Sequence, residues 1–445
     1  MKFVTILICK LLCFVGKLIG KGTSLPGAIA LKLQPNILKK LRLPDCVIAV
    51  TGSNGKTSTA EMIAKVLTDA GKRVVTNKEG SNQIEGVTTL LLKNATLGGR
   101  VKGDVILMES DERYARHTFR HIKPTMFVIT NLYRDQMTRN AHPYHIYNII
   151  KDAVDLVPDA TLVLNADDPI VRNFGTGRDN VVYFGMEENP MSSKTTDAVY
   201  NDCHYCPNCK APMEYDYFHY AHLGSYHCTG CGYSRPECTY RVDSMDLDQN
   251  RITVNGTPIH LEFSSKYYVY NLCAAYAVTD LLGLDADRTG QVLGRFVMQN
   301  GRNVRFTAGK NEGFLICSKH ENSTSYNQSL AYFTAQKDPS QLVIIVDAIS
   351  RKYYTGDISW IWDISFEMLK NANAQKIILS GKFAYDLGLR FQVTDIDPER
   401  IIVEPDLNKM GELIRNGEHR VYAVTCFSDK EKLFSQVQVH SPTAK

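Results

Sequence analysis

The sequence predicts an α/β protein with two α/β domains, the first of which carries a small cysteine-rich insertion. Short apolar segments of strand length alternate with segments in which apolar residues recur at helical spacing, as in parallel sheets covered by helices. A glycine-rich turn joins the first of these strands to a helix. Two Cys-x-x-Cys pairs stand close together in the middle of the chain.

The length of 445 residues is enough for several domains. A hydrophobic fraction of 44% and a charged fraction of 22% exclude a largely disordered chain. The net charge of +4 is too small to indicate a nucleic-acid partner. It conceals a local excess, because the first 42 residues hold eight basic residues and no acidic one, which leaves −4 for the rest.

Residues 1–45 form a predicted basic amphipathic segment. The apolar run at 3–19 is interrupted by lysines, so it is too short to span a membrane and lacks the order of a cleaved signal peptide. Four lysines share one side of the helix: Lys2, Lys10, Lys17 and Lys21. The helix either lies on an anionic membrane surface or packs its apolar face on the protein. Without a signal peptide, we expect a cytoplasmic protein with reduced cysteines.

Residues 46–306 form the predicted central domain, whose first strand, at 46–51, leads into a phosphate-binding turn. Glycines there let backbone N–H groups at the helix N-terminus reach phosphate oxygens. Lys56 is expected to neutralise the β- and γ-phosphates, and Thr57 to bind Mg²⁺. Val50 departs from the general pattern, which has glycine there. The predicted nucleotide-binding residues of this turn are Gly52, Asn54, Gly55, Lys56, Thr57 and Ser58.

Glu109 is the second predicted Mg²⁺ ligand. It ends an apolar strand at 105–108, and ligands bind at the carboxyl ends of strands in open α/β sheets. Asp111 and Glu112 come just after it, and we expect them to be solvated or to lie behind the metal ligands. Two more apolar strands extend the parallel pattern: 126–129 and 161–164.

Six of the twelve cysteines fall within a predicted insertion at 201–240. Two Cys-x-x-Cys pairs with 18 residues between them have the spacing of a zinc ribbon. The predicted ligands of this structural zinc are Cys206, Cys209, Cys228 and Cys231. We expect Cys203 and Cys238 to stay outside the metal site as free thiols. The neighbouring histidines are expected on the surface: His204, His219, His222 and His227.

Residues 307–445 form a second predicted α/β domain. Its four apolar strands lie at 313–317, 342–346, 376–380 and 421–425. In the loop after the second of these strands, Asp357 precedes the sequence Ile-Ser-Trp-Ile-Trp-Asp. An aspartate in this position either caps a helix or serves a function that these residues alone do not identify.

The phosphate-binding turn resembles the signature of the Mur ligases, ATP-dependent enzymes that form amide bonds in peptidoglycan synthesis. Three further segments are similar to that family: 165–169, 270–275 and 301–303. The resemblance implies a Mur-ligase-type central ATPase domain in which Asn271 contacts the adenine and Arg302 faces the phosphates.

Two features depart from a standard Mur ligase. Only about 50 residues precede the turn, too few for the UDP-binding domain that standard members carry there. Gln136 stands where amino-acid-adding members usually have histidine. The substrate is therefore not expected to be a soluble UDP-linked precursor.

Three features together resemble the MurT family, the synthetase subunits of lipid II isoglutaminyl synthases. They are a Mur-type ATPase without a UDP domain, a four-cysteine insertion and the tryptophan-containing segment after Asp357. The resemblance implies that Asp357, with Asp363 as the second candidate, completes the Cys-His-Asp triad of a GatD glutaminase partner. Relatives usually carry Lys-Asn-Pro early in this domain, whereas here Lys319 is followed by His320 and Glu321.

The resemblance also implies the reaction. ATP phosphorylates the α-carboxyl of D-glutamate in the lipid II stem peptide, and ammonia converts the acyl phosphate to D-isoglutamine. The expected catalytic residues are Lys56, Glu109 and Asp357, with ATP, Mg²⁺ and structural Zn²⁺ as cofactors. Ammonia is expected from a GatD-like subunit in a heterodimer. Peripheral contact with the inner face of the membrane stays open as a location.

Two other functions stay open from the sequence. The first is a stand-alone Mur-type ligase that joins an amino acid, and the missing UDP domain weighs against it. The second is a non-enzymatic zinc-ribbon module that binds ATP and contacts nucleic acid. The few basic residues in 201–240 weigh against this second function.

Overall fold

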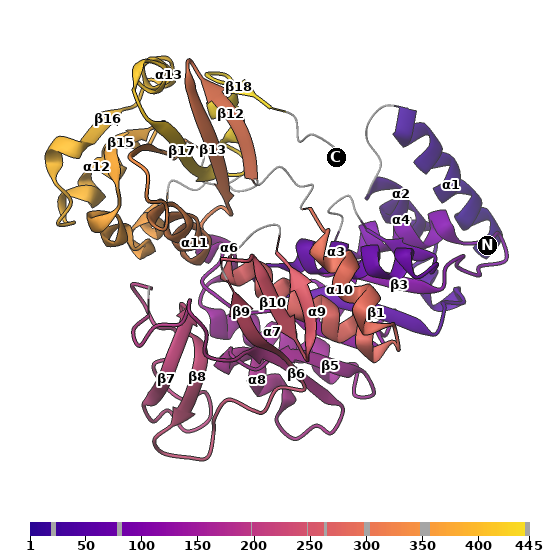
Figure 1. Ribbon diagram of the computed structural model, residues 1–445. Helices are drawn as coiled ribbons and strands as arrows, with labels where there is room; N and C mark the ends of the chain where they lie inside the picture. The colour runs from indigo at the N-terminus through magenta and orange to yellow at the C-terminus, as the bar shows by residue number, and fades with distance from the viewer. Residues whose placement is uncertain are drawn as a thin grey trace. The chain divides into compact units, whose positions relative to one another are not determined.

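The computed structural model describes residues 1–18, 24–77, 82–196, 198–246, 248–261, 265–297, 303–347 and 357–440 (Figure 1). The chain forms two compact units. Unit 1 comprises Met1–Leu132, Pro143–Thr195 and Asp202–Phe296, and unit 2 comprises Tyr133–His142, Thr196–Asn201 and Val297–Lys445. Each unit contains a mainly parallel sheet, so the predicted α/β fold class is confirmed.

In the part of the chain that the structure describes, the sheet of unit 1 has nine strands in the order β11-β10-β9-β6-β5-β4-β1-β3-β2. Neighbours from β2 through to β9 are parallel, and β10 and β11 continue as an antiparallel edge. The strands are β1 (Cys46–Thr51), β2 (Val74–Thr76), β3 (Val105–Glu109), β4 (Met126–Ile129), β5 (Thr161–Asn165), β6 (Val181–Met186), β9 (Tyr240–Asp246), β10 (Arg251–Val254) and β11 (Thr257–His260).

Strand β1 lies between β3 and β4, and five of its six residues are buried. This explains its continuous apolar run, because a strand inside a parallel sheet is covered by helices on both faces. The helices of unit 1 are α1 (Lys2–Leu18), α2 (Leu25–Leu33), η1 (Leu38–Lys40), α3 (Lys56–Asp69), α4 (Ile84–Asn94), α5 (Ala115–Phe119), α7 (Pro143–Asp155), α8 (Pro169–Arg172), η2 (Asn173–Gly175), α9 (Lys266–Leu281) and α10 (Ala286–Gly294).

The N-terminal helix α1 packs against α2 and α4 (Figure 1). Ile6 and Cys9 are fully buried in the core of unit 1. Lys10 donates from Nζ to the carbonyl oxygen of Lys93 at 2.6 Å. The interpretation that α1 packs on the protein therefore holds for the side of the helix that carries Ile6 and Cys9. Among the described residues, no helix is both long enough and apolar enough to cross a membrane.

The cysteine-rich insertion contains an antiparallel hairpin of β7 (Met213–Tyr220) and β8 (Leu223–Cys228). The hairpin forms a sheet separate from the nine-stranded one. Two knuckle turns, at 206–209 and 228–231, flank it. Its small core contains the aromatic side chains of Tyr226 and Tyr233 together with Cys206 and Cys228, and Cys231 packs against it.

Among its described residues, unit 2 has a sheet of seven strands in the order β16-β15-β14-β17-β13-β12-β18, parallel from β16 to β13. The elements are α6 (Met137–Asn140), β12 (Asn303–Ala308), β13 (Asn311–Ser318), α11 (Ser323–Thr334), β14 (Ser340–Ile345), η3 (Ser359–Asp363), η4 (Phe366–Asn371), β15 (Ala374–Ser380), α12 (Ala384–Gln392), η5 (Pro398–Arg400), β16 (Ile401–Glu404), α13 (Leu407–Asn416), β17 (Arg420–Cys426), α14 (Lys430–Phe434) and β18 (Gln438–Val439).

Candidate nucleotide and metal sites

The phosphate-binding turn, residues 52–55, connects β1 to α3, and α3 begins at Lys56. Gly55 has a φ of 84°, and a Cβ on it would lie 2.0 Å from Oδ1 of Asn271. Only glycine fits at a position with both constraints. Asn271, which the family resemblance assigns to the adenine, thus lies directly against the turn.

Lys56 is held over the turn in the described structure. Its Nζ donates to the carbonyl oxygen of Gly52 at 2.5 Å and to Oε1 of Glu112 at 2.5 Å. Glu112 and its neighbour Asp111 are buried. Of the two expected positions, solvated or behind the metal ligands, the solvated one is therefore wrong, and Glu112 lies directly behind the lysine. Sequence reasoning missed this ion pair because the strand pattern does not show which way the loop after β3 turns.

Thr57 and Glu109, the two predicted Mg²⁺ ligands, lie side by side. The Thr57 hydroxyl donates to Oε2 of Glu109 at 2.8 Å. The register explains the approach, because Val50 of β1 pairs with Glu109 of β3 across parallel strands. Asn77 holds Glu109 from the other side, with its amide bonded to both the N–H and the carbonyl oxygen of Glu109 at 2.9 Å. An oxygen donor set of this kind fits Mg²⁺.

Polar side chains at the end of β4 also shape the turn. Asn131 accepts a hydrogen bond at Oδ1 from the N–H of Asn54 at 2.8 Å. The Thr130 hydroxyl donates to the carbonyl oxygen of Asn54 at 2.7 Å. Thr130 and Asn131 could have been found from the sequence, because they are polar residues that directly follow the buried strand β4. Arg302 lies outside the described residues.

The four predicted zinc ligands come together. Their sulfur atoms all lie within 4.8 Å of one another, with Cys206 and Cys231 3.8 Å apart and Cys209 and Cys228 3.4 Å apart. Tetrahedral zinc–thiolate geometry requires sulfur atoms about 3.8 Å apart, so the group fits zinc. The Gly230 N–H donates to the Cys228 sulfur at 3.3 Å.

Burial raises the pKa of the Cys228 thiol, but the N–H of Gly230 and the Cys209 thiol outweigh burial and bring that pKa to about 6. A thiolate is the form of cysteine that binds metal. Cys203 and Cys238 lie outside the four-sulfur group and are buried.

The expected surface position is wrong for two of the four histidines. His204 and His227 are exposed, but His219 and His222 are each 1% exposed. His222 lies 3.4 Å from the Asp168 carboxylate. Burial lowers the pKa of His222, but Cys203 and Asp168 outweigh burial and raise that pKa well above its usual range. His219 is in β7 and His222 is in the turn before β8. The last four residues of β7 are all buried, so no alternating pattern marks His219 as a residue that packs inward.

A separate polar group lies in unit 2. Asp357 is exposed, and its Oδ1 accepts the N–H of Ser359 at 2.8 Å at the start of η3. This hydrogen bond lowers the pKa of Asp357, which keeps the carboxylate ionised at neutral pH. Asp363 lies 3.7 Å from Arg134, and its side chain is only 18% exposed. Asp357 is thus the more accessible of the two candidate aspartates.

Lys319 forms an ion pair with the buried carboxylate of Asp135. Asn322 donates from Nδ2 to the same carboxylate at 3.0 Å. A lysine and an asparagine therefore share one carboxylate here, although the asparagine stands three residues after the lysine. Gln136, the departure from the Mur ligase pattern, donates its N–H to the carbonyl oxygen of Glu321 at 2.9 Å.

Comparison with known proteins agrees with this geometry. The family model "Mur ligase middle domain" matches residues 50–215, and "MurT ligase C-terminal" matches residues 320–429. The lipid II isoglutaminyl synthase (glutamine-hydrolyzing) subunit MurT of Streptococcus pneumoniae is 32% identical over 412 residues, covering 91% of this chain and 89% of that protein. The chain belongs to the MurT family. The MurT subunit of Staphylococcus aureus strain COL is 31% identical over 397 residues, covering 89% of this chain and 87% of that protein.

Solved structures agree with the fold of this MurT-family chain. A pseudomurein peptide ligase type C from Methanothermus fervidus matches with a TM-score of 0.69 at 21% identity, covering 90% of this chain and 80% of that one. MurF from Thermotoga maritima in complex with ADP matches with a TM-score of 0.61 at 14% identity, covering 92% and 83%. The Mur-ligase fold and the predicted enzyme class, a ligase subunit of the isoglutaminyl synthase type, are confirmed.

Proposed function

We propose that this MurT-family chain amidates the D-glutamate α-carboxyl of the lipid II stem peptide with ammonia from a GatD-like glutaminase subunit. The observation that carries the proposal is the convergence of Lys56, Thr57 and Glu109 at the carboxyl ends of β1 and β3. The names of the curated relatives, which specify lipid II and glutamine hydrolysis, support the substrate and the nitrogen source.

In the first step, an oxygen of the D-glutamate carboxylate attacks the γ-phosphorus of ATP. The bond from that phosphorus to the bridging oxygen breaks, which gives an acyl phosphate and ADP. Lys56 and the backbone N–H groups of the turn stabilise the charge on the transferring phosphoryl group. Thr57 and Glu109 would hold Mg²⁺, which would supply charge neutralisation at the phosphates. Lys56 must exchange Glu112 for phosphate oxygens as the nucleotide binds.

In the second step, ammonia attacks the carbonyl carbon of the acyl phosphate. Inorganic phosphate leaves, and the nitrogen releases a proton to solvent to give the neutral amide. We assign Asp357 to the partner's glutaminase triad, where a carboxylate orients the histidine and stabilises its protonated form. Its exposure and its ionised state support this assignment over Asp363.

An assay of the heterodimer tests the proposal. With glutamine, ATP and lipid II, wild type should form amidated lipid II, and Lys56→Ala should lower the rate by about 10²-fold or more because phosphoryl stabilisation is lost. Asp357→Ala should lose glutamine-dependent amidation but keep amidation with free ammonia.

Two outcomes contradict these assignments. Equal loss with both nitrogen sources in Asp357→Ala would exclude the triad role. ADP release that needs an amino acid and no partner would point to a stand-alone ligase instead.

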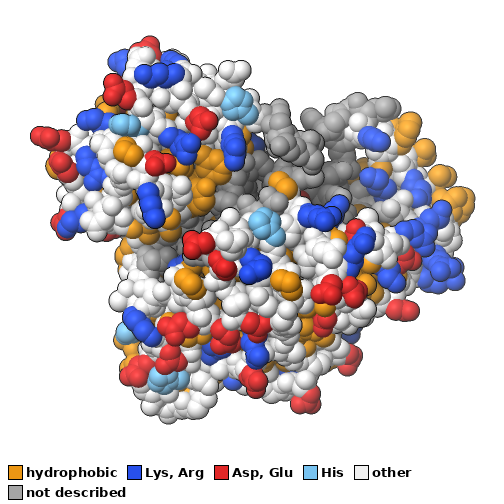
Figure 2. Space-filling model, viewed as in Figure 1, with side chains coloured by type: hydrophobic (Ala, Val, Ile, Leu, Met, Phe, Trp, Pro, Cys, Tyr) orange, Lys and Arg blue, Asp and Glu red, His pale blue; other side chains and the backbone are white. Residues whose placement is uncertain are grey.

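The proposed location is the cytoplasm, at the inner face of the membrane. The exposed side of helix α1 supports this location. Six apolar side chains are exposed there: Phe3, Val4, Leu7, Leu11, Phe14 and Val15. In Figure 2, hydrophobic and basic side chains gather at the right edge of the view, where Figure 1 places α1. An apolar stripe beside lysines suits a surface of anionic lipids, to which each nearby lysine contributes about 1 kcal/mol.

Vesicle binding tests this location. Val15→Glu should weaken binding of the full chain to phosphatidylglycerol vesicles several-fold, because a charge replaces an inserted apolar group. Val393→Glu is the matched control, since Val15 and Val393 are 52% and 62% exposed but only Val15 is on α1. Equal vesicle binding by the two variants would contradict the proposed membrane contact of α1. Deleting α1 is a poorer test, because Ile6 and Cys9 belong to the core.

A further inference from the structure

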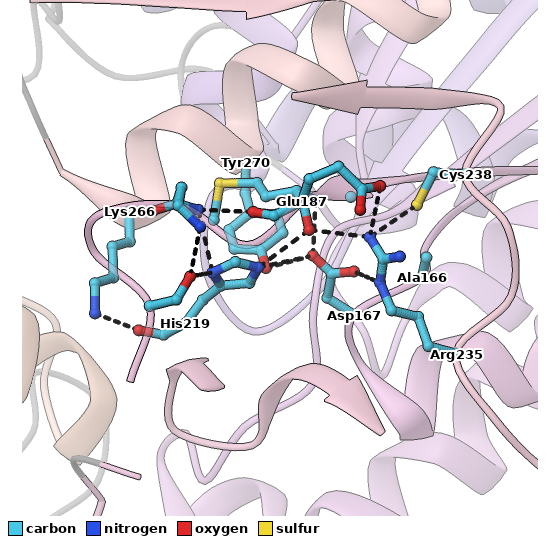
Figure 3. Close-up of polar contacts among 12 residues, drawn as sticks. Ala166, Asp167, Glu187, His219, Arg235, Cys238, Lys266 and Tyr270 are labelled. Atoms are coloured by element: carbon cyan, nitrogen blue, oxygen red, sulfur yellow. Dashed lines mark hydrogen bonds and ion pairs between the residues drawn. The ribbon is translucent and has the colours of Figure 1, made fainter. Parts of the chain in front are cut away.

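The cysteine-rich insertion is fastened to the central sheet through a buried carboxylate, Asp167 (Figure 3). Asp167 follows β5 and has no exposed surface. Arg235 of the insertion donates from Nε to Oδ1 of Asp167 at 2.6 Å and from Nη2 to the carbonyl oxygen of Met186 at 3.0 Å. A buried carboxylate requires such partners, because an unpaired charge is strongly disfavoured away from water.

His219 of β7 is a second contact from the insertion to the same place (Figure 3). Its Nε2 lies 3.1 Å from the carbonyl oxygen of Met186 and 3.7 Å from Oδ2 of Asp167, and its Nδ1 lies 3.1 Å from the hydroxyl of Ser192. Burial lowers the pKa of His219, so the ring is neutral at neutral pH. A proton on Nε2 suits the two oxygen acceptors, which leaves Nδ1 to accept from Ser192.

The other side of Asp167 is bonded to α9. The Tyr270 hydroxyl donates to Oδ2 of Asp167 at 2.6 Å. Lys266, the first residue of α9, donates from Nζ to the carbonyl oxygen of His219. Two side chains of α9 are therefore tied to the group that anchors the insertion.

The residue after Tyr270 reaches the phosphate-binding turn. Asn271 is buried, and its Oδ1 occupies the place that a Cβ on Gly55 would take. Helix α9 also packs along α3, the helix that begins at Lys56. A shift or rotation of α9 would therefore displace the wall of the nucleotide site.

Contacts thus run without a break from the insertion to the turn, through Arg235, Asp167, Tyr270, Asn271 and Gly55. The packing along this path leaves little room, since a Cβ on Gly185 would lie 2.6 Å from Oδ1 of Asp167. Apolar packing alone could stabilise the insertion equally well. Directional hydrogen bonds to a buried charge do more, because they favour a single position and rotation of α9.

We propose that Arg235, Asp167 and Tyr270 are positioning residues that hold α9 against the phosphate-binding turn and so set the affinity for the nucleotide. The cysteine-rich insertion then acts as a brace for the nucleotide site. This inference rests on the proposed binding of ATP, but it does not depend on the amide acceptor or on the glutaminase partner.

Tyr270→Phe tests the proposal because it removes only the hydroxyl that reaches Asp167. Tyr276→Phe is the matched control: Tyr276 is on the same helix, is equally buried, and its hydroxyl pairs with Thr257 at 2.8 Å. Binding of ADP with Mg²⁺ to the full chain is measured by titration calorimetry, below the unfolding transition of each variant. We expect binding about fivefold weaker for Tyr270→Phe and a change of less than about twofold for Tyr276→Phe.

Arg235→Lys provides a second test that preserves the charge beside Asp167. It loses the two-point contact with Asp167 and Met186, so ADP binding should also weaken. The double variant, Arg235→Lys with Tyr270→Phe, should bind ADP only slightly more weakly than whichever single variant has the lower ADP affinity, because both changes act through Asp167. In the assembled complex, Tyr270→Phe should raise the KM for ATP and leave kcat close to wild type.

The outcomes separate this inference from the proposed function. Equal ADP affinity of wild type, Tyr270→Phe and Tyr276→Phe would overturn the positioning role, as would fully additive losses in the double variant. A wild-type chain that binds no ADP would overturn the proposed function, and this inference with it.

Discussion

At Gly55, two constraints on a single residue meet. The backbone takes a φ of 84°, and the Asn271 side chain fills the space next to the missing Cβ. Gly71, at the end of the same helix, has a φ of 78°, but no atom of the described residues lies within 4 Å of the place that its Cβ would take. The two glycines therefore separate the effect of backbone strain from the effect of the nucleotide site.

Gly55→Ala should weaken ADP binding about tenfold or more and lower stability, because Asn271 must move away from the turn. Gly71→Ala should cost about 1 kcal/mol of stability through backbone strain alone and leave ADP binding unchanged. Titration calorimetry and thermal unfolding of both variants measure this. Similar ADP affinities for the two variants would contradict the role given to Asn271.

Residues whose position follows from local sequence were predictable, and residues whose position depends on packing were not. Lys56, Thr57 and Glu109 follow from a strand, a turn and a strand end, and the structure brings them together. His219 is different, because its burial depends on how the hairpin folds onto Met186 and Asp167, which lie 33 and 52 residues earlier in the chain. No periodicity within the insertion reports that distant contact.

At the scale of elements, the amphipathic character of α1 was predictable, but not which of its two apolar sides is buried in the core. One side, with Ile6 and Cys9, is buried in the core, and the other, with Leu11 and Phe14, is exposed. The sequence pattern shows where apolar residues fall around a helix. It does not show which of two apolar faces the rest of the chain covers.

The cysteine-rich insertion carries the element-scale prediction. We expect about one zinc per chain, held by the four clustered cysteines. Without the metal, their thiolates would repel one another at these short distances. Cys206→Ser should lose the zinc and speed amide exchange in β7 and β8, whereas Cys203→Ser, outside the four-sulfur group, should retain the metal. Metal analysis and hydrogen exchange measure this. A purified chain without zinc, or zinc retained in Cys206→Ser, would contradict the assignment.

At the scale of the whole molecule, unit 2 is discontinuous in the sequence, because Tyr133–His142 and Thr196–Asn201 belong to it. Periodicity within the C-terminal region predicts the strands of unit 2, but it does not predict that these two earlier segments belong to the same unit. Asp135 lies in the first of them, and its partners Lys319 and Asn322 come more than 180 residues later. A pairing so distant in sequence leaves no local signal.

Asp135→Asn should therefore speed amide exchange in α11, which starts directly after Asn322. The expected loss of local stability is about 1–3 kcal/mol, because Lys319 loses its charged partner. Asp152→Asn is the control, since Asp152 pairs with Arg116 and its side chain is 59% exposed. Unchanged exchange in α11 of Asp135→Asn would show that the pair does not hold this part of unit 2.

The same discontinuity has a consequence for how the protein breaks down. The backbone passes from one unit to the other five times, after residues 132, 142, 195, 201 and 296. A protease that cuts once at any of these crossings leaves the units joined by four other covalent connections. Separation into two free bodies requires all five cuts. Gene fragments that end at residue 296 likewise omit most of unit 2 but retain two short pieces of it.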